Sequence, residues 1–438
     1  MALQDSSPAA APGVLTPTEW SAATRVAFRF FFLYFTLWCF GTQVVGGLLQ
    51  MPGHFFPALG PLWPMADITR FTSQLVFGVD APFERGNSAD TLFWWAQTVW
   101  MLAFAIVATG VWTLFSRRRE YVTLHKWFFV TIRFALAAQM FYYGMAKVIP
   151  IQFMPPALTT LVQPVGALSL STLLWVFVGA SPIYQLFGGI AELVGAVALV
   201  FPRATALGAA ITLGDMIQVL ALNMGYDFGL KQISFHYIVM SLFLLAPDWR
   251  RLLNVLVLER PAPPSTRVPL FRSAGANRAA LVVQVLLGAY LLGNYTYLEG
   301  RQYSADEGPA HPKSVLYGIW NIERMSIDGT IRPTYENDYD MRFRRAVFDF
   351  PNRMAFQRTD DSMTRYDASI DPDRQTLTLG KFNSRTWSST LTYQRPTPDT
   401  LVLEGPFDGH MVRIEMERVG LDTFPLVSSP FRLVRPPD

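Results

Sequence analysis

The sequence predicts a polytopic α-helical membrane protein of about seven spans, followed by an all-β barrel or sandwich domain. Hydrophobic residues make up 51% of the 438 residues and the mean hydropathy is +0.24, which is too apolar for a water-soluble protein of this size. From Glu299 onward, alternating polar and apolar residues replace the long apolar runs. We therefore expect a polar N-terminal segment over residues 1–25, a transmembrane domain over 26–298 and a β domain over 299–438.

Seven apolar stretches come close to the roughly 17 to 25 residues that a helix needs to cross a bilayer, and the sixth is the shortest. The apolar stretch Leu168–Ala180 is too short to cross, so we expect a re-entrant or interfacial helix there. The loop Gln50–Asp90 is rich in Pro, Gly, Phe and Trp, which suits packing at the lipid headgroups, and we expect both segments to form a lid. The predicted spans are Val26–Leu49, Thr91–Phe115, Trp127–Val148, Ile183–Phe201, Ala204–Met224, Gln232–Ala246 and Ala279–Tyr297.

The basic residues predict which side of the membrane each loop faces. With the amino terminus inside, the outer loops contain only Arg70, Arg85 and Lys231, whereas the loops assigned to the cytoplasm contain thirteen basic residues. This imbalance predicts a multi-pass protein of the bacterial inner (cytoplasmic) membrane with a periplasmic β domain. The thirteen residues are Arg25, Arg29, Arg117, Arg118, Arg119, Lys126, Arg203, Arg250, Arg251, Arg260, Arg267, Arg272 and Arg278.

Composition also excludes several classes of protein. The single cysteine, Cys39, excludes disulfides within the chain and any Cys-x-x-Cys redox or haem-attachment motif. A net charge of +3 without a run of five or more basic residues argues against nucleic acid as a partner. The histidines are too scattered to predict a metal site. No intrinsic cofactor is evident, so redox chemistry would need a bound cofactor or another subunit.

The β domain is predicted from short alternating segments that turn formers separate. Eight or nine strands in this length suit a small up-and-down barrel, whose closure removes exposed strand edges. Aromatic residues such as Trp320 and Phe356 could line a ligand cavity, although in a barrel of this size they more often fill the interior. The predicted strands are Ser314–Arg324, Met341–Asp349, Arg353–Arg358, Met363–Ser369, Gln375–Leu379, Ser384–Gln394, Thr400–Glu404, His410–Val419 and Phe424–Arg435.

Four ionisable residues in the predicted spans are the candidate catalytic residues. Glu192 and Asp215 both lie about 13 Å from the predicted outer boundary at a rise of about 1.5 Å per residue, with Lys147 and His236 nearer that boundary. Ionisable groups are costly in a bilayer, so we expect these four to form one polar pocket. The alternative is that they only hold helices together, which polar residues between membrane helices commonly do. The candidate ligand-binding residues around them are Tyr143, Gln139, Gln218, Asn223, Asp227 and Lys231.

Four sequence segments carry a resemblance to the bacterial DoxX family of membrane proteins. They are Tyr143–Lys147 (YGMAK), Ile151–Pro156 (IQFMPP), Gly188–Leu193 (GGIAEL) and Leu222–Asp227 (LNMGYD). The resemblance implies a four-helix core over residues 127–246, with flanking spans and an outer β domain as in the larger members. It also implies a link to quinones, because the family takes its name from a quinone-linked subunit. In the β domain, Gly318–Trp320 resembles the Gly-x-Trp of a lipocalin first strand.

Two hypotheses for the function follow. In the first, the chain is a quinone-linked redox or proton-coupled membrane protein, in which Tyr143, Lys147 and His236 bind the quinone carbonyls and Glu192 and Asp215 transfer protons. In the second, the chain is a non-catalytic accessory subunit or assembly factor, whose outer β domain binds a lipid or a partner protein. The expected partners are therefore the lipid bilayer and protein subunits of a membrane complex.

Overall fold

The computed structural model describes residues 20–50, 56–84, 88–263, 265, 267–307, 312–333, 342–381, 384–429 and 434. The chain divides into two compact units, and each is described by itself. The first comprises Met1–Gln139, Gly195–Met216 and Gly229–Leu291, and the second comprises Met140–Val194, Ile217–Phe228 and Leu292–Asp438. Four of the five divisions fall within helices, and the β domain shares the second unit with the segment between the third and fourth predicted spans.

Several helices in the described part of the chain are long and apolar enough to cross a membrane. Length and composition identify Ala22–Gly41, Leu92–Phe115, Pro182–Val200, Pro202–Gly225 and Ala274–Ala305. The third and sixth predicted spans are also helices, but the sixth has only 15 residues, so a total of seven spans stays a prediction. The main helices are α1 (Ala22–Gly41), α2 (Gln43–Leu48), α4 (Leu92–Phe115), α5 (Val122–Val148), α8 (Pro182–Val200), α9 (Thr205–Gly225), α10 (Lys231–Leu245), α11 (Trp249–Leu256) and α12 (Ala274–Gln302).

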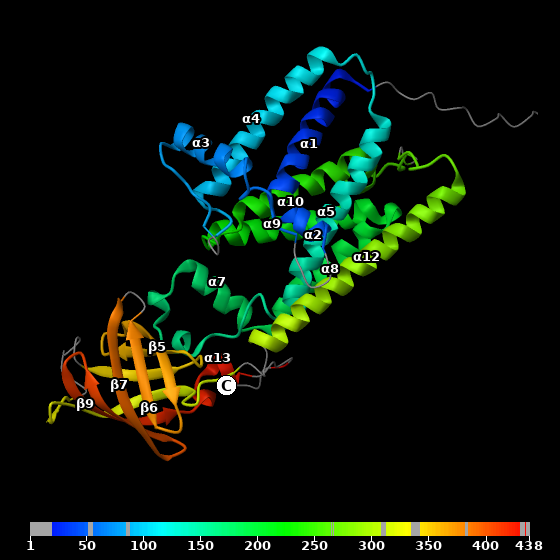
Figure 1. The fold of residues 1–438 in the computed structure, drawn as a ribbon. Coiled ribbons are helices and arrows are strands. Elements are labelled where there is room, and N and C mark those ends of the chain that lie inside the picture. Colours follow the sequence, from blue (N-terminus) through cyan, green and yellow to red (C-terminus); the bar gives the residue numbers. More distant parts are fainter. Residues whose placement is uncertain are drawn as a thin grey trace, which may run out of the picture. The chain divides into compact units, whose positions relative to one another are not determined.

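In the first unit, polar contacts fix the helix ends. The Ser21 hydroxyl accepts a hydrogen bond from the Thr24 backbone N–H and caps α1, which runs beside α4 (Figure 1). The Asp90 carboxylate accepts the backbone N–H groups of Lys231 and Gln232 at 2.7 and 2.9 Å. This distant carboxylate therefore satisfies two of the donors that the first turn of α10 leaves without helical partners.

The two predicted lid segments each contain a helix. In the loop Gln50–Asp90, α3 (Met65–Phe77) packs on α4, and the Trp100 indole donates to the Thr69 hydroxyl at 2.9 Å. The stretch predicted over Leu168–Ala180 forms α7 (Leu170–Gly179), which follows the short helix α6 (Leu158–Leu161). Residues 51–55 and 85–87 of the first loop, including Arg85, lie outside the described residues.

The C-terminal part of the second unit is a closed antiparallel β-barrel. Its strands follow the order β1-β3-β4-β5-β6-β7-β8-β9, and β1 pairs with β9, which closes eight strands into a ring. The two-residue strand β2 (Thr330–Ile331) pairs with β1 outside this ring. The remaining strands are β1 (Gly318–Ile327), β3 (Phe343–Phe348), β4 (Arg353–Arg358), β5 (Met363–Asp371), β6 (Thr376–Lys381), β7 (Ser384–Thr397), β8 (Thr400–Phe407) and β9 (His410–Val419).

The strand predicted over Phe424–Arg435 is wrong where the structure describes it. Leu421–Thr423 forms a 3-10 turn and α13 (Pro425–Ser428) is a short helix, while residues 430–433 and 435 lie outside the described residues. The physical reason is Pro425, which lacks the N–H that a ladder requires but suits the first turn of a helix.

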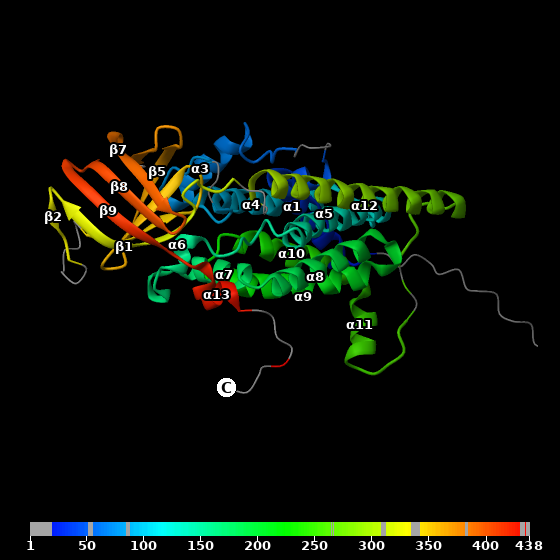
Figure 2. The ribbon, with the colours of Figure 1, turned by 90° about the horizontal axis from the view of Figure 1, so that it is seen from below.

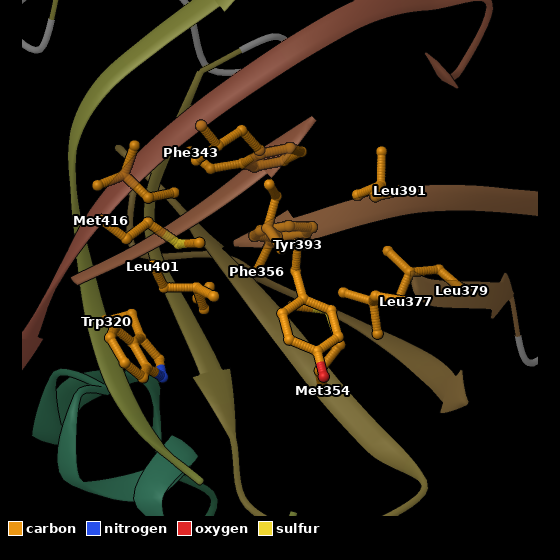
Figure 3. Packing of buried hydrophobic residues seen from close by; sticks show 14 of the residues in the cluster. Trp320, Phe343, Met354, Phe356, Leu377, Leu379, Leu391, Tyr393, Leu401 and Met416 are labelled. Atoms are coloured by element: carbon orange, nitrogen blue, oxygen red, sulfur yellow. The ribbon is translucent and has the colours of Figure 1, made fainter. Parts of the chain in front are cut away.

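The barrel interior is a hydrophobic core to which all eight strands contribute side chains. Figure 3 shows part of this packing. Trp320, Phe356 and Leu401 are each 0% exposed, and the Trp320 indole donates to the Leu316 carbonyl at 2.9 Å. Phe343 and Phe356 stack with their centroids 4.4 Å apart. These aromatic side chains therefore contribute to a packed interior, as small barrels usually require.

A second apolar cluster covers the outer face of the barrel beside β1, β3 and β4. Leu158 and Val162, from the segment around α6, pack against Ile319 and Val347, and all four are buried. Figure 2 shows α6 beside the barrel. The Leu158 N–H donates to the Asp349 carboxylate at 2.8 Å. The Gln357 amide donates to the Val162 carbonyl, also at 2.8 Å. The α6 segment is thus fastened to the barrel by both apolar and polar contacts.

Candidate functional site

The ion pair between Lys147 on α5 and Glu192 on α8 is the clearest site that the structure assembles from the predicted residues. The Lys147 ammonium lies 2.7 Å from each of the two Glu192 carboxylate oxygens. The Glu192 side chain is 2% exposed and the Lys147 side chain 13% exposed. Because a buried carboxylate is strongly disfavoured without a counter-charge, this lysine is what keeps an ionised Glu192 tolerable inside the protein.

Glycines on both helices open the path that the lysine takes. A Cβ added at Gly189 would lie 2.8 Å from the Gly144 carbonyl oxygen and 2.9 Å from the Lys147 Cβ. At Gly188, an added Cβ would lie 3.7 Å from the Lys147 Cδ. The lysine stem therefore passes over Gly188 and Gly189 to reach Glu192, at a close helix crossing of the kind that small residues allow.

Tyr143 lies one helical turn before Lys147 on α5 and borders the ion pair. The Lys147 ammonium is 5.7 Å from the centre of the Tyr143 ring, within the range of a cation–π contact. Tyr143 is half-buried. The i,i+4 spacing predicted this neighbourhood, and the structure brings Tyr143, Lys147 and Glu192 together in the second unit.

His236 lies in the first unit, where its partners come from α1 and from its own helix, α10. Its Nε2 is 2.6 Å from the Tyr34 hydroxyl and its Nδ1 is 2.7 Å from the Gln232 carbonyl oxygen. A carbonyl only accepts, so Nδ1 carries the proton and Nε2 accepts from Tyr34 in the neutral ring. Trp38 stacks on the imidazole with the centroids 4.3 Å apart at 6°. Both ring nitrogens and one ring face therefore already have partners.

Gln139 belongs to an adjoining set of buried hydrogen bonds. Its Oε1 accepts from the Tyr237 hydroxyl at 2.7 Å and from the Gln43 amide at 3.0 Å. Gln139 and Tyr237 are each 1% exposed. Tyr34, Trp38 and Gln43 were not among the predicted site residues, because aromatic and amide residues in an aromatic-rich apolar run give no distinct sequence signal.

The other predicted residues are distributed between the units. Asp215 is half-buried on α9 in the first unit, and Lys231 begins α10 there. Gln218 and Asn223 belong to the second unit; the Gln218 amide donates to the Tyr184 hydroxyl at 3.2 Å, and Asn223 is buried. A common pocket of the four predicted catalytic residues stays a prediction, because they fall in different units.

Asp227 follows α9 in a left-handed backbone conformation with φ at 51°, which suits a turn. It is exposed in the second unit. No group of three or more His, Cys, Asp or Glu residues in the described part of the chain is arranged to hold a metal ion.

The fold and this site define a protein with several apolar, membrane-length helices, a buried lysine–glutamate pair and a closed β-barrel. Over 129 residues the chain is 35% identical to the uncharacterized protein YwoB of Bacillus subtilis (strain 168), a stretch that covers 30% of this chain and 82% of the Bacillus protein. The chain therefore belongs to the family of this Bacillus protein. No family model and no solved structure matches the sequence.

Proposed function

We propose that the chain is a non-catalytic accessory subunit or assembly factor of a bacterial inner-membrane complex. Its helices anchor it in the bilayer, and the outer surface of its β domain binds a partner protein or a lipid. The excess of basic residues in alternate loops supports a cytoplasmic amino terminus and a periplasmic β domain. The four segments that resemble the DoxX family support a relation to that family.

The closed Lys147–Glu192 pair is the observation that carries this proposal. A general acid or base needs a reactive position within hydrogen-bond reach of a substrate. Both Glu192 oxygens are 2.7 Å from the lysine, and both His236 nitrogens have protein partners. Glu192 and His236 therefore already have hydrogen-bond partners within the protein, which favours a structural role over proton transfer.

The packed core of the barrel points the same way. A lipocalin-like carrier encloses its ligand, whereas the side chains inside this barrel pack against each other. Partner recognition is therefore assigned to the outside of the barrel, where the α6 segment already covers one face.

A quinone-linked, proton-coupled role is the second candidate, and one observation favours it. The Lys147 side chain retains 13% exposure beside the ring of Tyr143. A quinone carbonyl could reach this ammonium from the bilayer and compete with Glu192 for it. In that role the ion pair would be the resting state of a binding site.

One purification separates the two roles. The full chain, the Lys147→Met/Glu192→Leu variant and a form ending after Gln302 would be isolated from native membranes in mild detergent. Under the proposal, wild type and the double variant retain the same stoichiometric partner, and the form without the barrel loses it. The accessory role would be contradicted, and the redox role supported, if wild type contained quinone in its lipid extract and had no partner protein, while the double variant contained no quinone.

A further inference from the structure

A cavity rich in arginine lies where α1 begins and α4 ends, within the first unit. It has a volume of about 580 Å³, which is in the range of small-molecule sites. Of its nine lining residues, five are arginines and none is acidic. The arginines are Arg25, Arg29, Arg117, Arg118 and Arg119.

Arg29 is the anchor of this cavity, because it is 2% exposed. Its Nε and Nη2 donate to the Tyr121 hydroxyl at 3.2 and 2.9 Å, and its Nη1 donates to the Thr113 hydroxyl at 2.8 Å. Its guanidinium carbon is 5.2 Å from the centre of the Tyr121 ring. Within the described residues, this buried cation thus has neutral partners, although buried charges are normally paired with an opposite charge.

The chemistry of the cavity selects an anion with several oxygens. A guanidinium has five N–H donors, and the bonds of Arg29 within the described residues use three of them. The planar fork of arginine matches the oxygens of a phosphate group, which accepts two parallel hydrogen bonds from it. Five arginines with no acidic residue among the nine lining residues therefore favour a phosphate group.

The apolar surface beside the cavity indicates where the phosphate comes from. Leu114 and Phe115, which directly precede Ser116 in the cavity wall, are each 83% exposed, and Val111 on the preceding turn of α4 is 50% exposed. Side chains of this kind suit contact with acyl chains. Basic pockets at the ends of membrane helices bind the headgroups of acidic lipids. Apolar side chains beside such a pocket can contact the acyl chains of the same lipid.

We propose that this cavity binds the phosphate headgroup of an acidic phospholipid, with its acyl chains along the exposed face of α4. A soluble phosphate compound presents the same chemistry and is the other source of the ligand. The site is independent of the function proposed above, since it uses neither the Lys147–Glu192 pair nor the barrel.

The test is native mass spectrometry of the purified full chain in neutral detergent, with phosphatidylglycerol and phosphatidylcholine added in equal amounts. Wild type should retain phosphatidylglycerol preferentially. Arg117→Gln/Arg118→Gln/Arg119→Gln should weaken that retention at least roughly tenfold, since each basic residue near such a headgroup contributes to binding. These three side chains are exposed, so their replacement should leave the fold intact.

The matched control is Arg250→Gln/Arg260→Gln/Arg272→Gln, which removes the same charge from exposed positions outside the cavity. It should retain phosphatidylglycerol like wild type. Equal retention by the two triple variants, or no preference in wild type, would overturn the proposal. A second measurement compares how far inorganic phosphate and phosphatidylglycerol raise the melting temperature. An equal rise that depends on the same arginines would assign the site to a soluble anion instead.

Discussion

Large apolar side chains face inward in the barrel, whereas many of those on the membrane-length helices face outward. In the barrel, Trp320 and Phe356 are 0% exposed, whereas Leu114 and Phe115 on α4 are 83% exposed. Only 17% of the most apolar window of α4 is buried. The barrel thus shields the apolar residues of its interior from water by itself, while the helices require an apolar solvent around them.

Buried polar side chains are satisfied differently in the two regions. In the barrel, the guanidinium of Arg342 donates to the backbone carbonyls of Phe343 and Ile322 at 2.5 and 3.0 Å. On the helices, Lys147 pairs with Glu192 through side chains alone. Helix-interior backbone groups already bond to each other, so a buried charge such as the Glu192 carboxylate obtains its partner from a side chain of another helix.

Replacing Trp320 tests whether the hydrophobic core determines the stability of the barrel. Trp320→Ala should lower the free energy of unfolding of the barrel by roughly 3 to 5 kcal/mol, because it leaves a large cavity. Hydrogen exchange of β1 and β9 in the full chain would measure the loss. Met411→Ala, at a side chain that is 53% exposed, is the control and should have little effect. Unchanged exchange in Trp320→Ala would mean that the core does not determine barrel stability.

The Lys147–Glu192 pair allows the corresponding test on the helices. Glu192→Leu leaves the lysine without its counter-charge and should destabilise by roughly 3 kcal/mol, the lower end for a buried pair, since Lys147 is partly exposed. The double variant Lys147→Met/Glu192→Leu should recover most of that loss. Thermal unfolding in detergent would measure the cycle. Additive losses would show that the two residues act independently.

The close approach of Gly189 to Gly144 and Lys147 predicts a smaller loss of stability when Gly189 is replaced. Gly189→Ala should destabilise by roughly 1 to 3 kcal/mol, because its Cβ would collide with the Gly144 carbonyl and the Lys147 stem. Gly214→Ala, on α9, is the matched control, since an added Cβ there meets no atom within 4 Å. The same thermal unfolding assay applies. Similar melting temperatures for the two variants would contradict the close crossing of α5 and α8.

The smallest expected effect concerns pH and an exposed pair on the barrel. The hydrogen bond from His410 at 2.7 Å, together with one from the Met411 N–H, holds the pKa of the Asp328 carboxyl below its ordinary value. The stabilisation from a lowered pKa is present above the ordinary value and is lost as the pH falls through the lowered one. NMR titration should show the low pKa in wild type and a higher one in His410→Gln. An unchanged pKa would remove His410 as the cause.

The strands could be predicted from the sequence because alternation is a local signal. Arg353–Arg358 and His410–Val419 have the predicted bounds. The two-residue strand β2 was missed, since Thr330–Ile331 is too short to show a period. The predicted strand beginning at Phe424 was wrong because the apolar residues around Pro425 pack as a turn and a short helix.

The site was harder to predict because its partners come from distant helices. Sequence spacing placed Tyr143 beside Lys147. Glu192 drew attention because it and Asp215 lie equally far from the predicted outer membrane boundary. The Tyr34 hydroxyl is the partner of His236, yet the two residues are 202 positions apart, and only the packing of α1 against α10 brings them together. The cover of the barrel by Leu158 and Val162 likewise joins segments that no local pattern connects.

The pairing of β1 with β9 sets the order in which the barrel can form during synthesis. Ile319 on β1 lies opposite Val419 on β9, one hundred residues later in the chain. The ring therefore cannot close until β9 has been synthesised. Contacts of such long range make folding slow, since the loop entropy is lost before the contacts form. Until then β1 and β8 each present a free edge that can pair with another chain. The arrival of β9 therefore converts an open sheet with two free edges into a closed barrel.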